Sequence, residues 1–482
     1  MLASEHYNTL NPKSLFWAYG VLVLFSMLSS IVFESYLPFI IPVLPLGLGL
    51  IFDDYRRLFY LLFMTIPFSV EYYSESARLG TDLPSEPIMI FLSGITILAW
   101  IKLKFGVHRD YIMHSITLFL VLHIFWIFVT ALNSENLLIS IKVFTAKIWY
   151  ILPFFLFPLI TFKETAEYER TYKIVYKFLF VAICIVLVRH AFEGFSFAAS
   201  HGVVRPFFRN HVNYAAISVV CLPFVWAFLR IQKLEGKSTK WLTVIFLIFI
   251  VGIYFSYTRA AILSMIIALG AYYIIFKGWV KQALAISSFI AFIGVVWLSW
   301  NNKYMEFTPD FEKTITHKEF DNLLEATYKL EDISSMERVY RWMAGIEMIK
   351  DRFWMGFGPG SFYSNYKSYS ISRFQTYVSD NPEQSGIHNY FLMTWVEQGL
   401  IGFLIFIGLC FVLLIESENL YHRCADLKDK YLVMACALAF IIIFAMNLIN
   451  DLIETDKVGP FFFLNMAFLL FISSKYKKSK HY

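Results

Sequence analysis

Four short polar stretches interrupt a largely apolar sequence with side chains suited to binding phosphate or moving a proton. They span residues 205–214, 256–259, 338–342 and 388–397. A guanidinium group forms two parallel hydrogen bonds to phosphate oxygens, so the neighbouring Arg205 and Arg209 suit a diphosphate. The imidazole of His388 offers a base that takes a proton from a hydroxyl near neutral pH. The stretches therefore predict recognition of an anion beside a proton acceptor.

Two further arginines have positions that favour a functional role. The apolar run 241–276 is about twice the length of one membrane span, so the chain must reverse beside Arg259. A charge at that depth is costly unless it is paired, which favours an anionic substrate over contact with lipid phosphate. Arg338 lies one helical turn before Trp342 and lacks an acidic partner on its C-terminal side. An acidic residue four positions earlier explains Arg341 as a surface ion pair.

Each candidate also has a structural alternative. Arg205 and Arg209 suit ordinary anchoring at the membrane surface, and a histidine next to an asparagine suits a helix start. Glu397 lies about two turns inside an apolar run, so it is either a site residue or half of an ion pair, with Lys142 or Lys147 as its partner.

The outward histidines lack ligand spacing, the cysteines form no CxxC pair, and no phosphate-binding glycine loop is present. We therefore expect no metal and no cofactor.

The elements that position these residues are predicted to be membrane helices. The chain has 482 residues, 58% of them hydrophobic and only 16% charged, with a mean hydropathy of +0.59. This composition excludes a soluble multidomain enzyme. The sequence predicts an all-α, polytopic transmembrane helix bundle of about 12–14 spans with one large extracytoplasmic, mainly helical loop. The apolar runs are 15–33, 37–52, 58–70, 88–103, 112–132, 141–162, 174–190, 212–230, 241–257, 260–276, 281–300, 389–415, 431–449 and 459–474.

The orientation of the chain follows from which connectors carry lysine and arginine, because basic loops stay in the cytoplasm. Alternate connectors are basic, and the net charge of +5 reflects this bias without indicating nucleic acid binding. The termini are therefore predicted to be cytoplasmic. The expected segments are N-terminal spans in 1–300, a periplasmic loop with amphipathic helices in 301–388, C-terminal spans in 389–474 and a basic cytoplasmic tail in 475–482.

Four motifs in order resemble one family. Residues 208–215 read F-R-N-H-V-N-Y-A, 256–261 read S-Y-T-R-A-A, 338–362 run from R-V-Y-R-W to G-F-G-P-G-S-F, and 388–399 run from H-N-Y to E-Q-G. This set, over about 200–405, resembles the O-antigen ligase and polymerase superfamily of polytopic bacterial glycan transferases. One departure is Phe353-Trp354, which replaces the commoner H-P pair before the first glycine.

The resemblance implies a metal-independent transfer in the bacterial inner membrane. A glycan on undecaprenyl diphosphate would move to a hydroxyl of an acceptor at the periplasmic face, the acceptor being lipid A core, a glycan chain or a protein. If the roles known in this family apply to the matching positions, Arg259 and Arg338 hold the diphosphate as it leaves, and His388 orients or deprotonates the acceptor. The residues expected to bind the diphosphate or glycan are Arg205, Arg209, Asn210, Asn213, Trp342 and Glu397.

Alternatives remain at this point. An O-antigen ligase or a protein oligosaccharyltransferase stands against a repeat-unit polymerase, and a ligase-like enzyme is slightly favoured. The motifs do not separate the three, because they contact the donor that all three share. A secondary transporter of a small anion would also use arginines and Glu397, but transporters bind ions near the midplane between repeated halves. A scaffold for a polysaccharide export complex would explain the spans without the polar residues. Membrane lipids are expected partners in every case.

Overall fold

The computed structural model describes residues 54–74, 79–104, 106–307, 333–370 and 386–478, together with Val21, Phe25 and Ser29. The chain divides into two compact units, Met1–Leu62 and Phe63–Tyr482. All contacts discussed below lie within the second unit. Apart from Val21, Phe25 and Ser29, the apolar runs predicted at 15–33 and 37–52 lie outside the described residues, as does the stretch 308–332.

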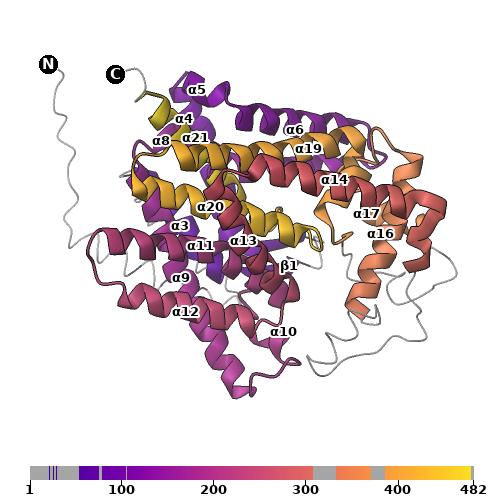
Figure 1. Cartoon of the computed structure of the whole chain (residues 1–482). Helices are drawn as coiled ribbons and strands as arrows, with labels where there is room; N and C mark the ends of the chain where they lie inside the picture. Colours follow the sequence, from indigo (N-terminus) through magenta and orange to yellow (C-terminus); the bar gives the residue numbers. More distant parts are fainter. Residues whose placement is uncertain are drawn as a thin grey trace. The chain divides into compact units, whose positions relative to one another are not determined.

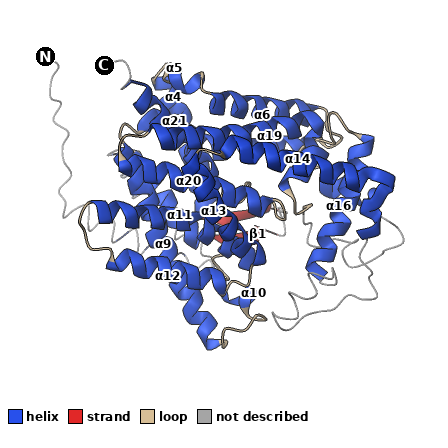
Figure 2. Cartoon of the chain, viewed as in Figure 1, coloured by secondary structure: helices blue, strands red, loops and turns tan. Residues whose placement is uncertain are grey.

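Helices dominate the part of the chain that the structure describes (Figures 1 and 2). Nine helical stretches of that part are long and apolar enough to cross a membrane, which confirms the expected all-α polytopic bundle. They are α4 (Ser85–Lys102), α6 (Ser115–Leu132), α7 (Leu137–Ile151) continuing through η3 (Leu152–Leu156) and α8 (Phe157–Thr161), α9 (Thr165–Phe192), α11 (His211–Leu234), α13 (Arg259–Lys277), α14 (Val280–Ser299) with η4 (Trp300–Phe307), α19 (Tyr390–Arg423) and α20 (Leu427–Asn447).

Further helices complete the described chain. Two are apolar: α12 (Lys240–Tyr254), which is short for a span, and α21 (Gly459–Lys478). The apolar stripe of Val339, Met343 and Ile346 predicts a helix that ends near Asp351, ahead of Gly356, and α16 (Ile333–Asp351) ends there. The remaining short elements are α3 (Arg56–Thr65), η2 (Ile66–Phe68), α5 (Arg109–Ile112), α10 (Ser200–Val203), α17 (Phe362–Asn365) and η6 (Tyr366–Tyr369).

The core of the second unit forms around α11 and α20, which pack against each other. They are also the most deeply buried of the candidate spans. Small side chains such as Ala215 and Ala439 line both helices and are fully buried. Small residues let helix backbones approach closely, which is how helices associate in a membrane. α20 also contacts α13 and α19, and α19 lies beside α6 (Figure 1).

One β-hairpin was not foreseen. β1 (Val70–Ser74) pairs antiparallel with β2 (Leu79–Leu83), with Glu71 opposite Asp82 (Figure 2). The net acidic composition of residues 71–87 predicts an outward loop there and gives no sign of strands. The strands are five residues each, too short to show a clear alternation of apolar and polar residues. The hairpin places two carboxylates side by side.

The loops predicted to face outward contact one another. Ser140 Oγ donates to the Pro359 carbonyl at 2.8 Å, and Thr258 Oγ1 donates to the His211 carbonyl at 3.3 Å. The basic connectors likewise meet one another, since Lys428 bonds to Glu235 at 2.5 Å. Lys477 bonds to Asp110 at 2.6 Å. The two groups of contacts agree with the predicted alternation of loops along the chain.

Candidate functional site

His388 occupies a tight turn just before α19. Its φ is +55°, in the left-handed region, and its backbone N–H donates to Asp451 Oδ2 at 3.0 Å. Gly386 packs against the same oxygen, because a Cβ there would lie 2.7 Å from it. The Asn389 side chain accepts from the Leu392 N–H at 3.0 Å and caps α19. The turn is therefore fixed through its backbone, which sets the direction of the imidazole.

Asp451 is the acceptor at the centre of this turn. Its carboxylate is buried, and Oδ1 has no hydrogen-bond partner among the described residues. Burial raises the pKa of Asp451 to about 7, against the lowering effect of the His388 N–H and the Arg341 charge. The carboxyl therefore changes its charge near neutral pH while it holds the histidine turn.

The His388 side chain is kept neutral by its surroundings. Burial, together with the positive charges of Arg341 and Arg338, lowers its pKa to about 3. A neutral imidazole is the form that accepts a proton. The predicted proton acceptor and the predicted phosphate-binding arginine thus lie within electrostatic reach of each other.

α16 supplies the arginines on one side of this turn. Arg338 Nε donates to the Ile449 carbonyl at 3.1 Å, and Trp342 Nε1 donates to the Ile387 carbonyl at 3.1 Å. These bonds attach the helix to both chain segments that meet at His388. Arg341 is 4% exposed, so the prediction that it lies at the surface is wrong. Arg341 instead lies on the same face of α16 as Arg338 and belongs to the candidate site.

Arg259 approaches the same region from another direction. The chain reverses between α12 and α13 as predicted, with Tyr257 at a φ of +54° and Arg259 as the first residue of α13. His211, the first residue of α11, lies within electrostatic reach of Arg259 and Arg338. The N-termini of α11 and α13 thus lie together beside two arginines. Helix N-termini carry partial positive charge, so this arrangement suits an anion.

The other residues predicted in the 205–214 stretch are held by neighbouring groups. Arg205 Nη2 contacts His201 Nε2 at 3.1 Å. Arg209 forms a two-point ion pair with Glu71 of the hairpin, in which Nε donates to Oε2 at 2.7 Å. The Asn210 side chain accepts from the Asn213 N–H at 2.9 Å and caps α11. Arg209 and Asn213 line a polar cavity described below.

Glu397 supports a glycine loop. It is buried, and its carboxylate accepts from the Phe362 N–H at 3.4 Å while its carbonyl accepts from the Gly358 N–H at 2.8 Å. Gly399 lies at a φ of +68°, and a Cβ there would come within 2.1 Å of the Trp354 carbonyl. Lys147 bonds to Glu454 and to the Tyr390 hydroxyl. Of the two lysines predicted as partners of Glu397, Lys147 therefore pairs with a different carboxylate.

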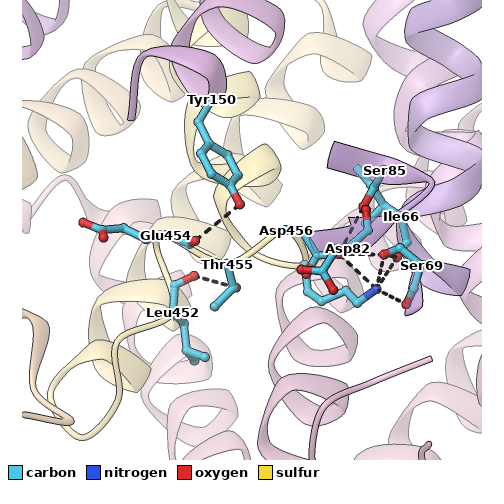
Figure 3. Close-up of polar contacts among 10 residues, drawn as sticks. Ile66, Ser69, Asp82, Ser85, Tyr150, Leu452, Glu454, Thr455 and Asp456 are labelled. Atoms are coloured by element: carbon cyan, nitrogen blue, oxygen red, sulfur yellow. Dashed lines mark hydrogen bonds and ion pairs between the residues drawn. The ribbon is translucent and has the colours of Figure 1, made fainter. Parts of the chain in front are cut away.

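The loop between α20 and α21, residues 448–458, was missed as a source of site residues. Besides Asp451 it carries Asp456, which accepts from Ser69 Oγ at 2.6 Å, and Lys457, which donates to the Ile66 carbonyl at 2.7 Å (Figure 3). Lys457 is 3% exposed and lies 3.1 Å from Asp456. Four charged residues between two apolar runs were the available signal. In this part of the molecule, no group of three or more described His, Cys, Asp or Glu residues is arranged to hold a metal ion.

Comparison with known proteins places these residues in context. Residues 244–407 match the family model described as O-Antigen ligase. We refer to this segment, about a third of the chain, as the O-antigen ligase domain after the family that it resembles. The predicted resemblance to the O-antigen ligase superfamily is confirmed by this match, and the apolar helices of the described residues indicate a multi-pass membrane protein. No curated protein matches the chain. The O-antigen ligase domain contains Arg259, Arg338, Trp342, His388 and Glu397, whereas the 205–214 stretch and Asp451 lie outside it.

Proposed function

We propose that this protein transfers a glycan from undecaprenyl diphosphate to an acceptor hydroxyl at the periplasmic face of the bacterial inner membrane. Lipid A core or a protein would be the acceptor, as in an O-antigen ligase. One observation carries the proposal: inside the O-antigen ligase domain, a neutral His388 lies within electrostatic reach of Arg338 and Arg341. The proposed orientation, with both termini in the cytoplasm, rests on the basic connectors, and the loop contacts agree with the alternation of loops between two sides.

The reaction divides between two groups of residues. The acceptor oxygen forms a bond to the anomeric carbon of the glycan, and the bond from that carbon to the diphosphate oxygen breaks. His388 receives the proton of the acceptor hydroxyl. Arg259 and Arg338, with the N-termini of α11 and α13, stabilise the charge that develops on the departing diphosphate. A bound diphosphate also raises the proton affinity of His388, because its negative charge offsets the two guanidinium groups.

The test is a gel profile of surface glycan together with mass analysis of the lipid-linked pool. The cells carry wild type, His388→Ala or Arg338→Ala as their only copy. Matched controls are His108→Ala and Arg109→Ala, since both residues are exposed and belong to a basic connector. We expect long glycan to accumulate on its carrier in the two site variants at normal membrane levels of protein. The control variants are expected to match wild type.

Other outcomes identify the alternatives. Attachment of only single repeat units in the site variants would identify a repeat-unit polymerase. Unchanged glycans would overturn the proposed site, and the anion transporter would then become the leading hypothesis. Addition of a chelator to the purified enzyme and its lipid-linked donor tests the predicted metal independence, which requires full activity without divalent ions.

A further inference from the structure

A polar cavity of about 290 Å³ lies beside the candidate site. Its wall is built by the β-hairpin, the start of α4, the start of α11 and the loop 448–458. Asn213 lies two residues from His211, and Glu454 lies three residues from Asp451. The cavity therefore shares two structural elements with the residues that surround His388 and Arg259.

Most charges on the wall are already compensated. Arg209 is paired with Glu71, and Lys457 is paired with Asp456. Glu454 is paired with Lys147. In Figure 3, Asp82 lies close to Asp456 and Ser69.

Two carboxyl groups remain, Asp82 and Glu86. Neither forms an ion pair with another described residue. Burial and the nearby charge of Asp456 raise the pKa of Asp82 to about 7. Above about pH 7 the ionised Asp82 therefore gives the cavity an excess of negative charge, which opposes the entry of a phosphate or a sugar acid.

The remaining chemistry of the wall suits hydroxyl groups. Carboxylates accept hydrogen bonds, the guanidinium of Arg209 donates them, and the amide of Asn213 does both. Phe207 adds an aromatic ring, held edge-to-face against Phe68 with centroids 5.4 Å apart. Pockets for drug-sized ligands start at about 300 Å³, so this cavity holds about one sugar unit.

We propose that this cavity is a binding subsite for one uncharged sugar unit of the transferred glycan or of its acceptor. The inference rests on the proposed function and extends it to substrate class. Arg209 then contacts sugar, because Glu71 neutralises its charge, and the diphosphate is left to Arg259 and Arg338. Asp82 and Glu86 exclude acidic sugars by repulsion.

The test measures binding of small probes to the full-length protein in lipid nanodiscs by saturation-transfer NMR. The probes are the uncharged methyl glycosides of glucose, galactose and mannose, and the anionic methyl glucuronide. The variant Asp82→Asn with Glu86→Gln removes the two charges with little change of shape. Asn213→Ala provides a second variant in a different element. Glu193→Gln is the control for loss of one carboxylate elsewhere, since Glu193 is exposed and does not line the cavity.

At pH 8, where Asp82 is ionised, we expect wild type to bind at least one uncharged glycoside and to exclude the glucuronide. Loss of a charged hydrogen-bonding partner weakens binding of that glycoside roughly tenfold, while the double variant gains glucuronide binding. The control behaves as wild type. Equal binding of uncharged and anionic probes by wild type, or unchanged binding in both cavity variants, would overturn the proposal.

Two further measurements separate this inference from the proposed function. His388→Ala is expected to abolish glycan transfer and to keep glycoside binding. If transfer survives in His388→Ala while the cavity variants still lose binding, the proposed function fails and the subsite stands. In a transfer assay, a rise of KM for the lipid-linked donor assigns the bound sugar to the glycan, and a rise of KM for the acceptor assigns it to the acceptor.

Discussion

The backbone N–H of His388 donates to the carboxylate of Asp451 at 3.0 Å, although the two residues are 63 positions apart in sequence. A residue outside the O-antigen ligase domain thereby holds the turn of the histidine inside it. The carboxyl has a pKa near 7 and the imidazole a pKa near 3. The charge that changes at neutral pH thus belongs to Asp451, and the histidine stays neutral.

Asp451→Asn tests this division of roles. Above about pH 7 the ionised Asp451 accepts more strongly from the His388 N–H and attracts Arg341, so we expect wild-type transfer to rise as the pH increases from about 6 to 8. Glu454 opposes this ionisation by its own negative charge. The asparagine variant keeps an acceptor oxygen but cannot ionise, so the pH dependence is expected to flatten. A pH profile of kcat/KM measures it, and a surviving rise near pH 7 would contradict the assignment.

Arg338→Lys separates charge from geometry. Lysine keeps the positive charge but lacks the planar fork and the bond from Nε to the Ile449 carbonyl. We expect roughly 10²-fold lower turnover for Arg338→Ala, in line with removal of one oxyanion donor, and a smaller loss for Arg338→Lys. Steady-state kinetics with a lipid-linked donor measures both. Turnover equal to the Arg109→Ala control would remove Arg338 from the site.

Gly399→Ala tests the contact between α19 and the glycine loop. The added Cβ would lie 2.1 Å from the Trp354 carbonyl at a φ of +68°, so something must move. We expect at least about 3 kcal/mol lower stability or failure to accumulate in the membrane. Gly294→Ala in α14 is the matched control, since nothing lies within 4 Å of its Cβ. Thermal unfolding in detergent compares the two, and equal midpoints would disprove the predicted clash.

Lys457→Met tests the buried ion pair beneath the hairpin. The change leaves Asp456 buried without its ammonium partner, which costs about 3–5 kcal/mol. We expect a large drop in the unfolding midpoint. Adding Asp456→Asn to the same chain is expected to recover part of the loss, because the uncompensated charge is then gone. A double variant less stable than Lys457→Met would refute this account.

The sequence was sufficient for the elements with strong local signals. The reversal before Arg259 follows from an apolar run of double length, and the end of α16 at Asp351 follows from the helical stripe and the glycines after it. The β-hairpin, Asp451 and the burial of Arg341 did not follow. Each depends on contacts between segments far apart in sequence, such as that of His388 with Asp451, which no local pattern records. The sequence identified Glu397 as an ionisable residue inside an apolar run. The backbone groups with which it forms hydrogen bonds could be recognised only in the structure.

The loop 448–458 binds residues made much earlier, from Ile66 of the first described helices to Arg338 and His388. These residues are synthesised and inserted into the membrane before the loop 448–458 is made. The histidine turn and the hairpin therefore acquire their supports only when synthesis has passed residue 458. On the proposed function, glycan transfer therefore becomes possible only late in biogenesis, because a nascent chain with most of its spans inserted lacks the assembled site.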